Sequence, residues 1–291
     1  MALTKENIIE LLKKDASEFS KYRQENPDLE IDLSNADLSG THLTGLNFSN
    51  ANLTEANLMG ASLSNINFND AILINADLKN TTMKSCSIQF ADLTGADLDW
   101  AEATNSDFTG SKLNSVKLTR ANLEGCNLSD VELTNSTLNK ALVTNAILEG
   151  ANLSDSNLYW TDISNSDLSK ANLSGVNLER ADMRYSTLIE CILDNSTLFW
   201  CDLSESNLTE ASLQKANLEK TIFKNCQMEQ ANLTEANLSN ADFRNANLVD
   251  AVLERANVEY TDFRGANLTG SSINFAENLL SAVMDKHTLM P

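Results

Sequence analysis

A five-residue period is the feature that most constrains the fold of this chain. From Leu33 to Ile273 every fifth residue is apolar, which gives 49 consecutive central positions, 34 of them leucine. On an α-helix, residues five apart are rotated by about 140°, so no helical face could stay apolar at this period. The pattern therefore predicts short extended segments with a corner in every pentad.

A second position of the pentad, two residues before the central one, is restricted to small side chains. It holds alanine 24 times, and serine, threonine, cysteine or valine at nearly all other places. The other three positions are mostly polar. We expect the central and small residues to point inward, where each buried leucine contributes roughly 1.5 to 3 kcal/mol before the loss of chain entropy.

The spacing of aromatic residues indicates how many pentads make one coil. Trp100, Trp160 and Trp200 are the only three tryptophans, and their separations of 60 and 40 residues are multiples of 20. The same spacing of 20 recurs in Phe223, Phe243 and Phe263. A 20-residue coil has four sides, and adjacent coils would pair as parallel strands about 4.8 Å apart. About 12 such coils are expected.

Both ends of the chain depart from the pentads. Apolar residues spaced three and four apart predict one amphipathic helix from Thr4 to about Gln24, with Thr4 as N-cap and Asn26-Pro27 as its end. A second, short amphipathic helix is predicted from Glu277 to about Lys286.

Open ends of a β-helix leave unpaired strand edges and an exposed core, so we expect both helices to act as caps. A dimer contact is the alternative for the C-terminal helix. The predicted domains are 1–30 (capping helix and linker), 31–275 (repeat β-helix) and 276–291 (capping helix and tail).

The net charge of -20 limits the classes of partner. It disfavours direct binding to nucleic acid or to an anionic membrane surface and favours basic or neutral partners. There is no apolar run of 18 residues and no signal-peptide pattern, so we expect a cytoplasmic protein without a membrane segment.

The sequence offers no residues typical of catalysis, a metal or a cofactor. All five cysteines occupy the small inward position and lack close ligand spacing, and their odd number agrees with a reducing compartment. The two histidines, His42 and His287, lie near opposite ends of the sequence, which leaves no histidine-based triad or histidine-rich metal site. We expect neither an enzyme nor a bound cofactor.

One outward column is acidic. It contains Asp162, Asp182, Asp202, Asp242 and Asp262. Stacked carboxylates could raise one another's pKa or hold a cation. The favoured interpretation is a solvated ladder, supported by Arg184, Arg244 and Arg264 on the same face.

A second outward column combines aromatic and cationic residues. Read every 20 residues, it runs Trp100, Arg120, Lys140, Trp160, Arg180, Trp200, Lys220, Asn240 and Tyr260. Tyr159 and Phe199 precede two of the tryptophans, which extends the aromatic surface. Arg180 is expected between Trp160 and Trp200, stacked on both rings. Two interpretations stay open: a self-stabilising ladder, or a strip that binds a partner, including a second copy of the chain.

The uninterrupted A-(D/N)-L-x-x pattern, as in Ala91-Asp92-Leu93 and Ala236-Asn237-Leu238, resembles the pentapeptide-repeat family, especially bacterial and cyanobacterial members. The resemblance covers about 245 of the 291 residues. It implies a right-handed, four-sided parallel β-helix. It implies little about function, although some members resemble DNA and bind or protect type II topoisomerases.

Two functional hypotheses follow. The first is a non-catalytic structural or adaptor protein that presents the aromatic and cationic column to a protein whose identity the sequence does not give. The alternative is a DNA mimic that binds or protects a topoisomerase such as gyrase, or another DNA-binding protein. Its charge would be about one per 3 Å of rod, against one per 1.7 Å in duplex DNA, and the cationic column would interrupt one face.

Overall fold

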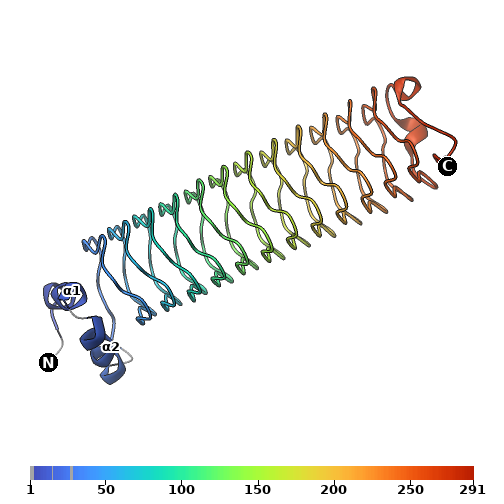
Figure 1. Ribbon diagram of the computed structural model, residues 1–291. Helices are drawn as coiled ribbons and strands as arrows, with labels where there is room; N and C mark the ends of the chain where they lie inside the picture. The colour runs from blue at the N-terminus through green and yellow to red at the C-terminus, as the bar shows by residue number, and fades with distance from the viewer. Residues whose placement is uncertain (1–2, 15, 27–28) are drawn as a thin grey trace. The chain divides into compact units, whose positions relative to one another are not determined.

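The computed structural model describes residues 3–14, 16–26 and 29–291 and divides into two compact units, Met1–Leu142 and Val143–Pro291. Each unit is a stack of coils (Figure 1). In the first unit the coils follow two helices, and in the second they end in short 3-10 turns. The boundary between the units falls inside the predicted repeat domain.

Parallel bridges join residues that are 20 apart, so four pentads make one coil. In the first unit the bridges run from Asp32–Asn52 to Asn122–Leu142, and in the second they begin at Ile147–Asp167. Each side of a coil contributes one bridging residue rather than a long strand. The 20-residue period read from the tryptophans is confirmed.

Every corner is a tight turn whose third residue has a left-handed backbone conformation. In the pentad of Leu158, the amide of Thr161 donates to the carbonyl of Leu158 at 3.1 Å, and Trp160 between them has φ 59°. A positive φ at the third residue defines a type II turn. A positive φ recurs at every fifth residue from Asn35 to Gly270, and all ten glycines of the chain occupy such positions.

At many corners, an asparagine or aspartate directly before the central residue supports the turn that follows it. The side-chain oxygen of Asn157 accepts a hydrogen bond from the backbone amide of Tyr159 at 3.2 Å, and Asp162 does the same for Ser164 at 3.0 Å. Asparagine and aspartate favour this local turn because their short side chains reach the amide two residues on. This explains their abundance at a position that the sequence analysis treated only as outward.

The core consists of the central and small residues, as predicted. All 49 central residues from Leu33 to Ile273 are buried. Polar side chains at the small position bond to the previous coil, as when the Ser186 hydroxyl donates to the carbonyl of Ile163 at 2.9 Å. Such bonds remove the desolvation penalty of a buried hydroxyl.

The N-terminal segment forms two helices, α1 (Lys5–Lys14) and α2 (Ala16–Glu25), where one was predicted. Thr4 caps α1, since its hydroxyl accepts the amide of Asn7 at 3.3 Å. A single 21-residue helix would be about 32 Å long. Two short helices instead allow both to contact the first coils, through Lys5 and Phe19. Pro27, the predicted helix breaker, lies outside the described residues.

Specific contacts tie α2 to the coils of its unit. The ring of Phe19 stacks on that of Phe48, with centroids 5.1 Å apart. The buried guanidinium of Arg23 donates to the carbonyl of Ser49 at 2.6 Å. These contacts place an apolar ring and a hydrogen-bond donor against the first coils.

The helix predicted from Glu277 to Lys286 is wrong. The segment contains the 3-10 turn η2 (Leu279–Ser281), which follows η1 (Ile273–Phe275). Val283 and Leu289 lie extended, and their carbonyls accept the amides of Phe263 and Leu268, both at 2.8 Å. The last regular coil has amides that need acceptors, and an extended chain supplies them where a helix would keep its carbonyls for itself.

Candidate interaction surface

The aromatic and cationic column lies at one corner of the coils. In the second unit we define the aromatic strip as Tyr159, Trp160, Arg180, Phe199, Trp200, Lys220 and Tyr260. Backbone bonds hold its coils in register: the amide of Trp160 donates to Glu179 at 3.0 Å, and the amide of Arg180 donates to Phe199 at 3.0 Å. The strip is therefore mounted on a regular backbone ladder.

The large rings of the strip are strongly exposed. The exposed fractions of Trp160, Trp200 and Tyr260 are 53%, 51% and 60%. Tyr159 and Phe199 are half-buried beside the two tryptophans. The ring centroids of Tyr159 and Trp160 are 6.0 Å apart, and those of Phe199 and Trp200 are 6.3 Å apart in an edge-to-face arrangement. The rings therefore form two neighbouring pairs that lie two coils apart, and the single patch expected from the sequence stays a prediction.

Of the two cations of the strip, Lys220 contacts aromatic rings, whereas Arg180 does not make the contacts expected for it. The ammonium of Lys220 lies 5.8 Å from the ring centroid of Trp200 and 5.1 Å from that of Phe199. Arg180 pairs with the Glu179 carboxylate at 3.6 Å, and its expected stacking on Trp160 and Trp200 is not seen among the described contacts. The Glu179 carboxylate, on the same corner, competes with the rings for the guanidinium of Arg180. The two side chains can pair there without any change of the backbone.

The first unit carries its own part of the column. Trp100 is 51% exposed, and the guanidinium carbon of Arg120 lies 4.5 Å from its ring centroid. Lys140 occupies the same corner position on the coil after Arg120, also with a left-handed backbone. Here a cation–π contact joins neighbouring coils of the column, between residues for which the sequence analysis made no such prediction.

The backbone of this corner does not favour aromatic residues. Trp100, Trp160 and Trp200 have φ between 59° and 64°. In this left-handed region a β-carbon approaches the backbone, so bulky residues are uncommon there, while glycine, asparagine and aspartate are tolerated. Tryptophan therefore gains no local backbone stabilisation at this place.

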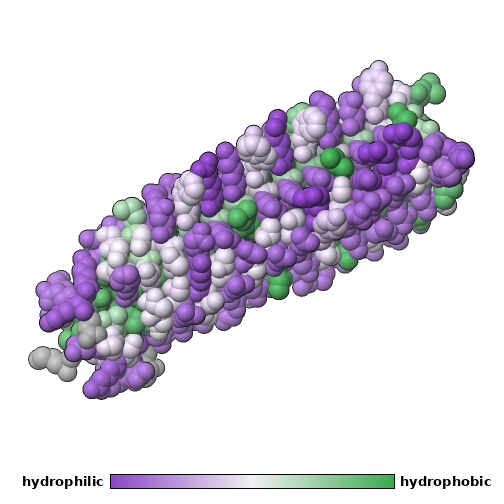
Figure 2. Space-filling view, viewed as in Figure 1, coloured by the Kyte–Doolittle hydropathy of each residue, from purple (hydrophilic) through white to green (hydrophobic). Residues whose placement is uncertain are grey.

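Other exposed aromatic residues stand apart from the strip. Phe90 is 64% exposed and Tyr185 is 60% exposed, and each occupies a corner of its own unit other than the tryptophan corner. Figure 2 shows a mainly hydrophilic surface on which apolar side chains appear as separate spots. The strip differs from these single residues because it repeats on successive coils.

The acidic column is largely paired with arginine. Arg184 bonds to Asp182 at 2.6 Å, and Arg264 bonds to Asp262 at 2.6 Å. Hydrogen bonds from Arg264 lower the pKa of Asp262 and outweigh the opposite effect of burial. Burial raises the pKa of Asp182, yet the bonds from Arg184 leave it below the usual value. The arrangement fits a solvated ion-pair ladder, and the described residues contain no group of three or more metal-binding side chains.

The cysteines are buried free thiols, as predicted. Burial raises the pKa of Cys86 to about 11 and that of Cys226 to about 12. The thiolate is the reactive form, so thiols with such a high pKa are poor nucleophiles. They fill space as small apolar residues.

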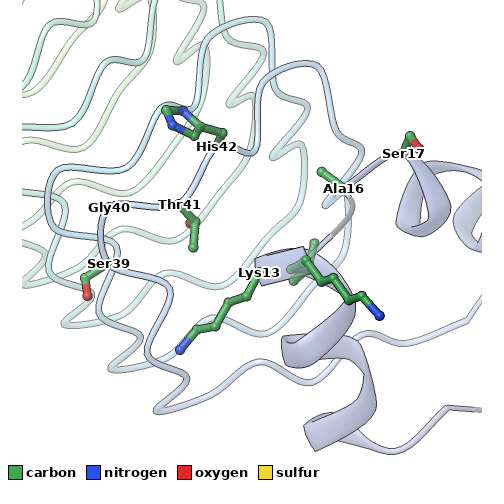
Figure 3. A pocket seen from close by; sticks show the side chains of 9 residues that line it. Lys13, Ala16, Ser17, Ser39, Gly40, Thr41 and His42 are labelled. Atoms are coloured by element: carbon green, nitrogen blue, oxygen red, sulfur yellow. The ribbon is translucent and has the colours of Figure 1, made fainter.

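A polar cleft lies beside α1 in the first unit (Figure 3). It has a volume of about 670 Å³ and its lining includes Lys13, Ser39, Thr41 and His42. Lys13 lies 3.8 Å from the carboxylate of Asp37, and the His42 ring lies within hydrogen-bond distance of the Ser62 hydroxyl, at 3.3 Å. Among the lining residues that the structure describes, no nucleophile, base and acid are directed at one point.

A family model for pentapeptide repeats matches the chain in overlapping segments. They are residues 31–70, 61–99, 91–130, 126–169, 162–198, 201–240, 211–248, 231–270 and 246–277. Together with the four-sided coils, this match shows that the chain belongs to the pentapeptide-repeat family. Members of this family are generally structural or interaction proteins rather than enzymes. No curated protein matched significantly.

Several solved pentapeptide-repeat proteins resemble the chain. HetL, involved in heterocyst differentiation regulation in the cyanobacterium Nostoc sp. strain PCC 7120, is 27% identical; the match covers 78% of this chain and 94% of that chain, with TM-score 0.28. QnrB1, a plasmid-mediated fluoroquinolone resistance protein, is 17% identical, with coverages of 69% and 93% and TM-score 0.48.

Rfr23 from the cyanobacterium Cyanothece 51142 is 26% identical, with coverages of 57% and 89% and TM-score 0.12. With TM-scores below 0.5, these structures define neither a partner nor a site for this chain. Among the described residues, no helix is long and apolar enough to cross a membrane.

Proposed function

We propose that this chain is a non-catalytic interaction protein that binds a partner protein through the aromatic strip. The observation that carries the proposal is the exposure of Trp160 and Trp200, at 53% and 51%, beside Tyr159 and Phe199. Aromatic residues and arginine are enriched in protein interfaces and dominate their binding energy.

The contacts of the rings favour binding over a purely stabilising ladder. The described ring partner of Trp200 is Phe199 of its own pentad, and the described contact of Trp200 with the next coil is the cation–π contact of Lys220. Lys220 lies over the rings of both Trp200 and Phe199, and exposed cation–π contacts of this kind are worth about 0.5 to 1 kcal/mol each. This small gain is offset by placing tryptophan on a left-handed backbone.

The remaining chemistry limits where and how the protein acts. We propose a reducing, cytoplasmic location, which free buried thiols support. The contacts of Phe19 and Arg23 with the first coils support a capping role for α2. The net charge of -20 supports a protein partner over nucleic acid or an anionic membrane.

A capture experiment from the native cell extract tests the strip. Immobilised wild-type chain is compared with Trp160→Ala/Trp200→Ala and with Tyr185→Ala, which removes an exposed aromatic residue from another corner. The proposal expects a stoichiometric partner, which includes a second copy of the chain, to be lost only from the strip variant. Equal capture by all three proteins would contradict it.

A second candidate is DNA mimicry, and one observation favours it. The corner diagonally opposite the strip, two pentads away in the second unit, carries three acidic residues, Glu190, Glu210 and Asp250, along with one cation, Lys170. A gyrase supercoiling assay tests this candidate with the wild type and with Glu190→Gln/Glu210→Gln. Inhibition or protection at micromolar concentration that weakens in the variant would support mimicry, and no effect of the wild type would exclude gyrase as the target.

A further inference from the structure

We infer that the partner of the aromatic strip is a second copy of this chain, bound antiparallel, with the two-fold axis between the coil of Arg180 and the coil of Trp200. This inference rests on the proposed function, because it names the occupant of the same strip. It adds a register, in which Trp160, Arg180, Trp200 and Lys220 each have a stated opposite residue.

The order of residues along the strip is complementary to itself when reversed. Four successive coils present Trp160, Arg180, Trp200 and Lys220 at one corner. An antiparallel two-fold operation places Trp160 opposite Lys220 and Arg180 opposite Trp200. Every opposite pair then joins an aromatic ring to a cation, which is the self-complementarity that a two-fold interface requires.

The backbone supports this register over its whole length. The four residues lie on coils spaced about 4.8 Å apart, and the amides of Trp160, Arg180 and Trp200 donate to the next coil at 3.0, 3.0 and 3.4 Å. Equal steps on both copies keep all four pairs aligned. The neighbouring residues fit as well, because Tyr159 comes opposite Glu219 and its hydroxyl can donate to that carboxylate.

Charge distinguishes this corner from the one diagonally opposite. Over the same coils the strip is neutral, since Arg180 and Lys220 are balanced by Glu179 and Glu219, at 3.6 and 3.3 Å. The same two-fold operation on the other corner would bring like charges together, Glu190 opposite Glu210. In a chain with net charge -20, the strip is a place where two copies can approach without repulsion.

The size of the contact predicts its strength. Four coils span only about 14 Å at the β spacing, so the contact is small and belongs with the weak interfaces below about 1,200 Å² in total. We therefore expect a dimer that dissociates on dilution. Its formation depends on the four ring and cation pairs rather than on a large apolar area.

A residue swap tests the register. In Trp200→Arg, Arg180 of one copy meets a cation of the other, and we expect the dimer to weaken by on the order of tenfold or more. The double variant Arg180→Trp/Trp200→Arg restores ring opposite cation and should return the wild-type mass. Both residue types already occupy this corner with φ near 59°, and Arg120 and Lys140 already stand on adjacent coils in the first unit.

Sedimentation velocity over a concentration series is the measurement, with circular dichroism melting to confirm that each variant is folded. Tyr185→Arg is the matched control, because it replaces an exposed aromatic residue with arginine at another corner and should leave the dimer intact. A wild-type dimer that is lost in Trp200→Arg and recovered in the double variant supports the inference. A dimer insensitive to Trp200→Arg, or one not recovered by the swap, overturns it.

A wild-type chain that stays monomeric at high concentration also overturns the inference, and the capture experiment then separates the two proposals. If capture of another protein still depends on Trp160 and Trp200, the strip remains a binding surface and only the second copy is wrong. If neither self-association nor capture depends on these residues, both proposals fail.

Discussion

Two aromatic ladders in the second unit differ in almost every physical respect. Phe223, Phe243 and Phe263 lie inside the coils, fully buried, with ring centroids 4.6 and 5.3 Å apart from one coil to the next. Trp160 and Trp200 lie outside, half exposed, on left-handed backbone. The same 20-residue repeat therefore produces one aromatic ladder inside the core and one whose rings lie at the surface.

The largest effect is expected inside the coils. Phe243→Ala removes the middle ring of three, so the two stacked contacts at 4.6 and 5.3 Å are lost and a cavity is left. Such substitutions cost about 3 to 5 kcal/mol. Denaturant unfolding of wild type and variant would measure the loss, and a change below about 1 kcal/mol would contradict a rigid stacked core.

The sequence was sufficient to predict the interior of the coils because burial constrains it so strictly. Leu158 and Phe243 recur in phase with every other central residue, and a one-residue shift would expose them. The period of 20 followed from widely spaced aromatic residues. These features depend only on apolar periodicity, which a single sequence shows directly.

The corners and ends could not be predicted in the same way. The left-handed conformation of Trp160 has no marker in its residue type, since asparagine, lysine, glutamate and glycine share the position. Arg180 had a ring and a carboxylate within reach, and spacing alone did not choose between them. At the C-terminus the apolar spacing suggested a helix, but unsatisfied amides such as that of Phe263 required an extended chain.

A smaller loss is expected where a corner glycine is replaced. Gly175 has φ 67°, and an added β-carbon would lie 2.5 Å from the side-chain oxygen of Asp155 on the previous coil. Gly175→Ala should cost about 1 kcal/mol for the left-handed backbone, plus the displacement of that carboxylate. Gly40→Ala is the control, because nothing lies within 4 Å of its added carbon. Equal losses in thermal unfolding would show that the backbone alone decides the effect.

The one small central residue offers a gain instead of a loss. Ala103 is fully buried between the coil positions of Met83 and Leu123, where other coils carry a larger side chain. Ala103→Leu should be neutral or should stabilise the chain by up to about 1 kcal/mol, as cavity-filling substitutions do. A fall of several degrees in melting temperature would show that neighbouring side chains already fill the space.

The ion pairs beside the strip should contribute less to the stability of the fold than any core residue does. Their contribution should be present only above acidic pH. Arg264 lowers the pKa of Asp262 in the folded chain, so the pair stabilises fully above the unfolded value of about 3.9. This stabilisation is lost as the pH falls through the lower folded pKa. Melting temperatures of wild type and Arg264→Gln should therefore differ at pH 7 and converge toward pH 2, while a constant difference would point to packing of the arginine stem.

The smallest effect on stability, and the sharpest contrast with Phe243→Ala, is expected for Trp200→Ala. The indole is 51% exposed and its removal opens no cavity, so unfolding should change by less than about 0.5 kcal/mol. The contact with Lys220 is the main described interaction lost. Dimer formation or capture of a partner should nevertheless fall sharply. The opposite result would be a Trp200→Ala variant that is destabilised as much as a core variant but associates as the wild type does. The outer ladder would then be a second stabilising element and not a binding surface.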